Sequence, residues 1–325
     1  MSRPHISLIL KHLFFDLMDK RFYFISAIIG ILSSALVLVL FSFADKSKPT
    51  KAENDAYRSV INGEYRIFAM PLPEQMDFAG EHVPLDRPDV RESLDRELLV
   101  NTYWHSNTLL TIKRAYRWFP VIEPILKANE IPDDFKYLAV IESSLSNATS
   151  PAGAKGFWQF LEETGRGYGL EISNQVDERY DVEKSTYAAC HYLKDAFDKY
   201  GSWSMAAASY NMGMAGLQRV TDQQYQSAYW DLLLNEETAR YVYRILAVKE
   251  IFTHADQYGF VLRPAELYEP LRVNSVRVDK SIPDLAAFAK ENGLTYKLLK
   301  WYNPWLRDSS LKVPAGKTYE VKIPA

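Results

Sequence analysis

The chain has 325 residues and a formal net charge of −3, a size that fits two ordinary domains or one large domain with attachments. This near-neutral balance argues against a nucleic-acid partner, which would normally bring a strong basic excess. A single cysteine, Cys190, excludes an intramolecular disulfide. We expect it to be a buried, inert thiol on the apolar stripe of a helix.

Residues 22–43 form an apolar segment without charge or proline. As a helix, this segment is long enough to cross a hydrocarbon layer of about 30 Å. Basic residues are equally frequent on both sides, so the positive-inside rule leaves its orientation open. The segment is longer than the apolar part of a usual signal peptide. We therefore expect an uncleaved transmembrane helix after a short segment, residues 1–21. A cleaved signal peptide is the alternative.

The following residues, 44–89, are polar and rich in proline, which is typical of a linker. From Val90 the apolar spacing becomes helical, and Pro120 and Pro124 are expected to interrupt that pattern. A glycine-punctuated loop is expected over 149–169. Helices are expected over 133–145, 184–200, 203–210 and 237–254. Because no alternating strand pattern is present, residues 90–258 should form one mostly α domain.

The C-terminal part has a different pattern. Residues 271–278, 311–314 and 319–323 alternate like strands, and residues 282–290 and 296–301 have the spacing of two short helices. The sequence therefore predicts a small α+β module over 271–325.

Glu142 is the strongest candidate for a chemical role on local grounds. In the predicted helix, Leu138, Ile141 and Leu145 share an apolar stripe, and Glu142 lies about 40° from Leu138 around the axis. A carboxylate beside a buried face is paired, at a helix boundary or functional. Burial raises a carboxyl pKa, so such a group can donate a proton near neutral pH. The sequence contains no His/Cys metal cluster and no phosphate-binding glycine loop, and no cofactor is expected.

Four motifs around Glu142 carry a resemblance. The chain reads Ile-Glu-Ser-Ser at 141–144, Gly-Phe-Trp-Gln at 156–159, Ser-Tyr-Asn at 209–211 and Glu-Thr-Ala-Arg-Tyr at 237–241, with Thr-Gly-Arg-Gly-Tyr-Gly at 164–169. In this order and spacing the motifs resemble those of the lytic transglycosylases of glycoside hydrolase family 23, over roughly residues 90–255. Phe157-Trp158 stands where Leu-Met is usual, and Ser209 stands where Ala is usual. Neither change removes a reacting group.

The resemblance implies a lysozyme-like fold and an enzyme that cleaves the β-1,4 bond between N-acetylmuramic acid and N-acetylglucosamine in peptidoglycan, leaving 1,6-anhydro ends. Glu142 would be the catalytic acid and base, and a second carboxylate would not be needed, unlike in glycosidases with paired carboxylates. A hydrolase of the goose-lysozyme type and a non-catalytic peptidoglycan-binding protein are the alternatives. Residues implied to bind substrate are Ser143, Gly156, Gln159, Tyr210, Asn211 and Tyr241.

Residues 285–304 resemble the helical half of a LysM module, although Lys280-Ser281-Ile282 replaces the usual opening Gly-Asp-Thr. Glycan strands of peptidoglycan are the expected partner. Because peptidoglycan lies outside the inner membrane, residues 44–325 are expected in the periplasm and residues 1–21 in the cytoplasm. The alternative of a cleaved signal peptide would give a soluble periplasmic protein.

Overall fold

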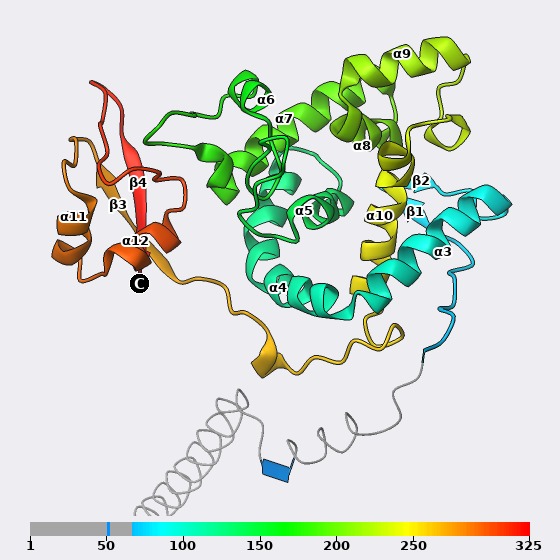
Figure 1. The fold of residues 1–325 in the computed structure, drawn as a ribbon, viewed down its shortest axis with the longest axis horizontal. Helices are drawn as coiled ribbons and strands as arrows, with labels where there is room; N and C mark the ends of the chain where they lie inside the picture. Colours follow the sequence, from blue (N-terminus) through cyan, green and yellow to red (C-terminus); the bar gives the residue numbers. More distant parts are fainter. Residues whose placement is uncertain (1–50, 53–66) are drawn as a thin grey trace, which may run out of the picture. The chain divides into compact units, whose positions relative to one another are not determined.

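A computed structural model of the chain describes residues 51–52 and 67–325, and most of this part is helical (Figure 1). The strands are β1 (Asp77–Phe78), β2 (Glu81–His82), β3 (Val273–Val278) and β4 (Tyr319–Pro324). The helices are α3 (Pro88–Tyr103), α4 (His105–Ala128), α5 (Lys136–Ser143), α6 (Glu162–Gly167), α7 (Val182–Tyr200), α8 (Trp203–Met212), α9 (Met214–Gln224), α10 (Glu236–Thr253), α11 (Leu285–Glu291) and α12 (Tyr296–Tyr302).

Helix α10 lies at the centre of the larger helical group and packs against α3, α5 and α8 (Figure 1). Its apolar side chains recur at helical spacing, and Val242, Ile245 and Ile251 are fully buried. Asn235 begins the helix by accepting a hydrogen bond from the Thr238 N–H. The short helix α5, which carries Glu142, packs against α4 as well as α10.

The four helices expected between 133 and 254 correspond to α5 with its preceding 3-10 turn, α7, α8 and α10. Local chemistry fixes their ends. Asp181 caps the start of α7 by accepting from the Lys184 N–H, and Gly201 ends it in the left-handed conformation that glycine tolerates. Two helices were not expected. Helix α6 lies inside the predicted glycine-punctuated loop, and α9 follows Gly213.

The expectation that Pro120 and Pro124 interrupt the helical pattern was wrong, because α4 runs through both. A proline inside a helix leaves the carbonyl four residues earlier without its usual donor. Those carbonyls belong here to Tyr116 and Pro120. Tyr116, Pro120 and Pro124 all face solvent at a spacing of four residues, so water can satisfy the freed carbonyls.

Part of the proline-rich range 44–89 belongs to the folded unit. Strands β1 and β2 form a small antiparallel hairpin, and Phe78, Val83 and Leu85 are buried in the main hydrophobic core. The Glu81 carboxylate accepts hydrogen bonds from the Trp203 and Ser204 N–H groups at the start of α8. A carboxylate is favourable at a helix N-terminus, where unpaired N–H groups gather.

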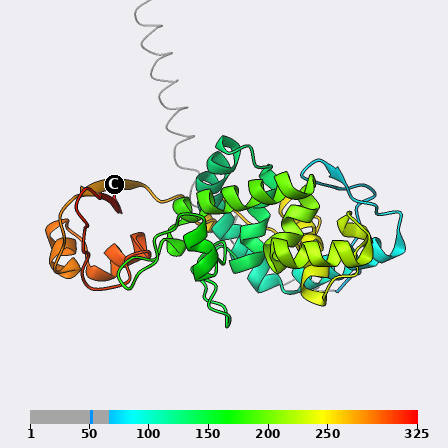
Figure 2. The same cartoon turned by 90° about the horizontal axis from the view of Figure 1, so that it is seen from above.

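The C-terminal residues form the predicted pair of helices, α11 and α12, with β3 and β4 paired antiparallel (Figure 1, Figure 2). Val278, Leu285, Leu299 and Val321 are buried in their own hydrophobic cluster. The strand expected over 311–314 was wrong. Leu311 makes an isolated bridge to Ile282 instead, which is too short to form a strand.

The transmembrane helix expected over 22–43 lies outside the described residues. Within 51–52 and 67–325, no helix has both the length and the apolar character that a membrane crossing requires.

Candidate active site

Glu142 lies in the last turn of α5, where the backbone changes direction. Ser144 and Leu145 both adopt positive φ angles, 50° and 52°, a region that L-residues rarely occupy. The Ser144 N–H still bonds to the Val140 carbonyl, so the helix closes its last turn before the chain leaves. Gln159, on the facing loop, also has a positive φ of 49°. Such strained residues often gather at functional sites.

The Glu142 carboxyl is surrounded by groups that act on its ionisation. Burial is the largest influence and raises the pKa of Glu142 from 4.5 to about 7. A hydrogen bond donated by the Tyr241 hydroxyl and the charge of Arg244 oppose this rise in pKa, whereas the carboxylate of Glu237 adds to it. Burial also raises the pKa of Tyr241 well above its ordinary value, so Tyr241 remains a neutral donor. At neutral pH the Glu142 carboxyl is therefore populated in both protonation states.

One pocket beside Glu142, of about 270 Å³, contains three of the six predicted substrate-binding residues, Gln159, Tyr210 and Asn211. The Tyr210 hydroxyl donates to the Trp158 carbonyl at 2.8 Å. The Asn211 amide donates to Glu237 at 3.0 Å and its oxygen accepts from the Thr238 hydroxyl at 2.7 Å. These bonds hold the polar groups in fixed orientations towards the pocket.

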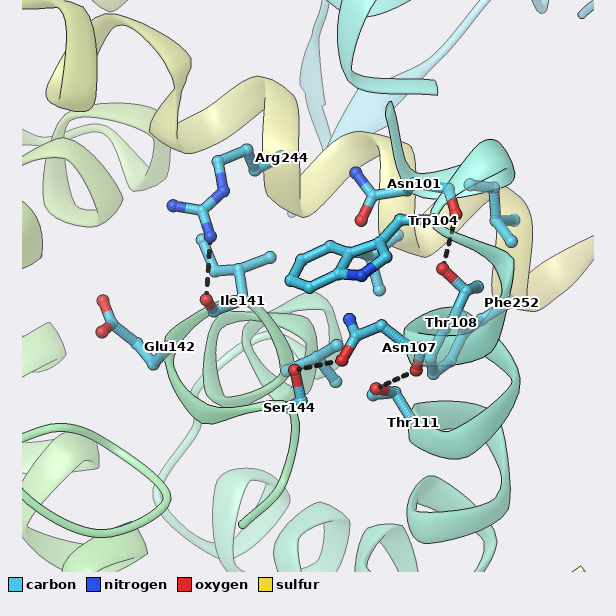
Figure 3. A pocket seen from close by; sticks show the side chains of 13 residues that line it. Asn101, Trp104, Asn107, Thr108, Thr111, Ile141, Glu142, Ser144, Arg244 and Phe252 are labelled. Carbon is cyan, nitrogen blue, oxygen red and sulfur yellow. Dashed lines mark hydrogen bonds between the residues drawn. The ribbon is translucent and has the colours of Figure 1, made fainter. Parts of the chain in front are cut away.

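Glu142 also lines a second pocket, of about 230 Å³, which Figure 3 shows. The side chains of Trp104, Asn107 and Arg244 face the same space in this view. Trp104 is 60% exposed, which leaves its ring open for contact with a ligand. Arg244 donates to the Ile141 carbonyl at 3.0 Å. Glu142 thus lines both pockets, so a ligand bound in either one can reach it.

Two of the predicted residues support the site from behind. Ser143 is buried, and its hydroxyl oxygen lies 3.1 Å from the Ala139 carbonyl oxygen and 2.9 Å from the Phe157 carbonyl oxygen, which share its single proton. Gly156 has a φ of 80°, and a Cβ atom there would lie 1.8 Å from the Arg179 carbonyl oxygen. The close approach at Gly156 is therefore to the protein's own backbone, and neither residue lines the two pockets beside Glu142.

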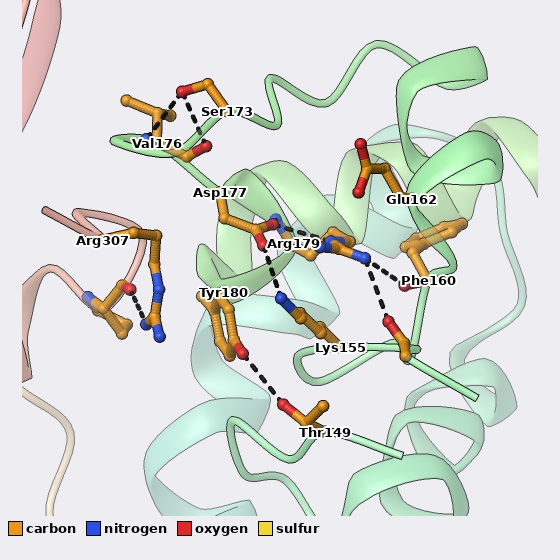
Figure 4. Close-up of polar contacts among 12 residues, drawn as sticks. Thr149, Lys155, Phe160, Glu162, Ser173, Val176, Asp177, Arg179, Tyr180 and Arg307 are labelled. Atoms are coloured by element: carbon orange, nitrogen blue, oxygen red, sulfur yellow. Dashed lines mark hydrogen bonds and ion pairs between the residues drawn. The ribbon is translucent and has the colours of Figure 1, made fainter. Parts of the chain in front are cut away.

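A buried ion pair holds the loop that carries Gln159 (Figure 4). Arg179 and Asp177 are almost inaccessible to solvent and bond through two nitrogens, at 2.8 and 2.7 Å. A bidentate pair fixes the guanidinium plane. Its remaining nitrogen donates to the Phe160 carbonyl at 3.3 Å, and Lys155 lies 3.8 Å from Asp177. Because Arg179 stands 19 residues after Phe160, the shape of the loop depends on contacts outside its own residues.

Sequence reasoning missed four groups at the site: Glu237, Arg244, Trp104 and Asn107. A signal was available for Arg244, which follows Tyr241 by three residues and so shares its helical face. Glu237 stands in one of the quoted motifs, four residues before Tyr241. Trp104 and Asn107 carry no local signal, because they reach the site from the junction of α3 and α4 and from the start of α4, through tertiary packing.

Comparisons with known proteins match two parts of the chain to described domains. Residues 120–233 match the transglycosylase SLT domain, and residues 274–325 match the soluble lytic transglycosylase C-terminal LysM-like domain. The chain is 31% identical over 246 residues to membrane-bound lytic murein transglycosylase D of Escherichia coli K12, which covers 72% of the chain and 52% of that protein.

Membrane-bound lytic murein transglycosylase F of Cronobacter sakazakii is 28% identical over 127 residues, which cover 35% of the chain and 23% of that protein. The chain thus spans about half the length of the D-type relative. It contains a transglycosylase SLT domain over residues 120–233 and, behind it, a LysM-like domain of the soluble lytic transglycosylase type over residues 274–325.

Proposed function

We propose that the chain is a peptidoglycan lytic transglycosylase that cleaves the β-1,4 bond between N-acetylmuramic acid and N-acetylglucosamine and leaves 1,6-anhydro ends. The observation that carries this proposal is that Glu142 lines two pockets and that burial raises the pKa of its carboxyl to about 7. The relatives are named as lytic murein transglycosylases, which supports the same reaction class.

In the proposed reaction, protonated Glu142 gives its proton to the glycosidic oxygen as the bond from that oxygen to the anomeric carbon breaks. The ionised carboxylate then takes the proton of the muramoyl 6-hydroxyl, whose oxygen bonds to the anomeric carbon. No water is consumed, and Glu142 ends in its starting protonation state. A carboxyl with a pKa near the working pH suits both transfers. The Tyr241 hydroxyl orients the carboxyl and stabilises its ionised form.

One observation favours hydrolysis as a second candidate reaction. Glu237 lines the same pocket as Glu142 and raises the pKa of Glu142. Most glycoside hydrolases use a pair of carboxylates. In the transglycosylase proposal Glu237 holds Asn211 and tunes Glu142. In a hydrolase it would activate water. The two reactions give products that differ in mass by one water molecule.

The test is a digest of purified sacculi by the full chain, with mass detection of the released muropeptides. We expect anhydro ends from the parent chain and no release from Glu142→Gln. The matched control is Glu163→Gln, an exposed glutamate on α6, which should behave like the parent. Reducing ends would support the hydrolase. Undiminished release by Glu142→Gln would refute the role given to Glu142, and sacculus binding without any release would support a non-catalytic binding protein.

The location belongs to the same proposal. Peptidoglycan as substrate requires residues 44–325 to lie in the periplasm, and residues 22–43 would anchor the chain in the inner membrane. The D-type and F-type relatives are named as membrane-bound. The intact mass of the protein purified from membranes tests this. An N-terminus that retains residues 1–43 supports the anchor, and a mature chain without them supports a cleaved signal peptide.

A further inference from the structure

A third pocket, of about 430 Å³, lies between the helical domain and the LysM-like module. Its walls come from α4, from residues 145–147 that follow the catalytic helix, from the segment 268–273 and from α12 with the residues after it. Neither the proposed reaction nor the compared domains assign a role to this interdomain pocket.

Positive charge gathers on its walls. Arg114 donates to the Ser144 carbonyl at 3.0 Å, Arg117 donates to the Glu269 carbonyl at 2.9 Å, and Lys300 donates to the Leu306 and Asp308 carbonyls. Among the described residues, none of these three cations has a carboxylate within ion-pair distance. Burial, together with Arg307 nearby, lowers the pKa of Lys300, and the charge of Asp308 opposes this shift only in part.

The other charged groups on the walls are already engaged. Lys322 pairs with Glu183, and Asp181 caps the start of α7. Among the described residues, the pocket therefore offers three cations that donate hydrogen bonds to neutral carbonyls, while its own carboxylates have partners. Such a set favours an anionic ligand, because a carboxylate would supply the charge that the walls lack.

The same pocket has an aromatic surface. Trp301 is 50% exposed, and the Arg117 guanidinium lies 5.2 Å from the Tyr268 ring centre and 5.8 Å from that of Trp301. Trp118 packs edge-on against Phe157 deeper in the wall. Flat aromatic faces next to fixed guanidinium groups suit a ligand that combines apolar groups with carboxylates.

Helix α4 connects this pocket with the candidate active site. Asn107 and Thr111 line the pocket beside Glu142, whereas Arg114 and Trp118 line the interdomain pocket. Their spacing of four, three and four residues places all of them on one face of the helix. At 1.5 Å per residue, Thr111 and Trp118 lie roughly 10 Å apart along the axis. A ligand that leaves the active site along α4 can thus enter the interdomain pocket.

We propose that the interdomain pocket binds the peptide stem of peptidoglycan, with the free carboxylates of the stem at Arg114, Arg117 and Lys300 and its apolar part against Trp301. This proposal rests on the proposed function for the identity of the ligand. An unsubstituted, uncharged glycan would leave the three cations unpaired, which is why the stem, and not the bare sugar chain, is the fitting occupant.

The test measures binding of a tetrapeptide stem, cut from sacculi by an amidase, to the full Glu142→Gln chain by calorimetry. Arg117→Glu and Trp301→Ala should each weaken binding tenfold or more, which is about 1.4 kcal/mol. The matched controls are Arg91→Glu and Tyr187→Ala, two exposed residues outside the pocket. They should bind like the parent. Added salt should weaken binding, because an ion pair open to solvent is screened.

Arg117→Lys keeps the positive charge, so it distinguishes loss of the charge from misfolding as the cause of weaker binding. Recovery of binding by Arg117→Lys would support the stem site. Equal affinity in all variants, or no binding of the stem to the parent, would overturn it. Failure of the proposed function gives a different result: the chain with Glu142 intact would release no muropeptide, while stem binding would still depend on Arg117 and Trp301.

Discussion

Replacing Glu142 by Gln should abolish muropeptide release and at the same time stabilise the fold at alkaline pH. Burial moves the carboxyl pKa from 4.5 to about 7, so the folded protein resists ionisation of this group. Each pKa unit corresponds to about 1.4 kcal/mol, which gives a cost of about 3 kcal/mol when the carboxyl is fully ionised. Gln has the same shape, accepts the Tyr241 hydrogen bond and carries no charge.

The sign follows from the two pKa values. Below 4.5 the group is protonated in both the folded and the unfolded state, so it costs no stability. As the pH rises through 4.5, Glu142 ionises first in the unfolded state. This ionisation lowers the free energy of the unfolded state relative to that of the folded state. The full cost is reached above about pH 7. The stability advantage of Glu142→Gln should therefore be near zero at pH 4, about half its maximum near pH 5.5 and about 3 kcal/mol at pH 8.

Thermal unfolding followed by near-UV circular dichroism at these pH values measures the effect. For a unit of this size, about 2–4 °C per kcal/mol gives an upward shift in Tm on the order of 10 °C at pH 8. Glu163→Gln, at an exposed position, should shift the Tm equally little at every pH. Two results would refute the argument that burial penalises the charged carboxyl. One is an equal Tm for Glu142→Gln and the parent at pH 8, and the other is a Tm difference that does not change with pH.

In the parent, Arg244 lowers the pKa of Glu142 and Glu237 raises it. The alkaline limb of kcat/KM should therefore move to higher pH in Arg244→Gln and to lower pH in Glu237→Gln. Shifts in the same direction would contradict this. In chemical denaturation, Gly156→Ala should lose more than about 3 kcal/mol of unfolding free energy, because its new Cβ atom would overlap the backbone. Gly153→Ala has a similar φ but open space around it, so it should lose about 1 kcal/mol. Glu81→Ala should lose about 2 kcal/mol in the same assay, through the unpaired N-terminus of α8; an unchanged midpoint would exclude this capping role.

Regular elements with strong local signals were predictable from the sequence. Helix α7 begins at a capping aspartate and ends at Gly201, and both ends were close to those expected. Glu142 could be selected because helical periodicity places it beside an apolar stripe. These features depend on a few neighbouring residues, so a pattern in one stretch of chain contains the information.

Other features depend on residues far apart in the sequence. The solvent-facing side of α4 tolerates Pro120 and Pro124, and only the packed structure shows which side faces solvent. Ser143 turns towards Phe157 and not towards the pockets. The interdomain pocket needs residues from α4 and α12 together. Local patterns carry no information on such distant pairs.

The contact between the LysM-like module and the loop 171–180 has a consequence for domain recombination. Val176 and Tyr180 belong to the module's own hydrophobic cluster. The Asp177 N–H donates to the Trp305 carbonyl and the Arg307 N–H to the Gln175 carbonyl, at 2.9 and 2.7 Å. Exchanging the module for that of another protein would leave this loop with mismatched partners. The unit that can be inherited or transplanted intact therefore includes residues 171–180 as well as the module, although about a hundred residues separate them in the chain.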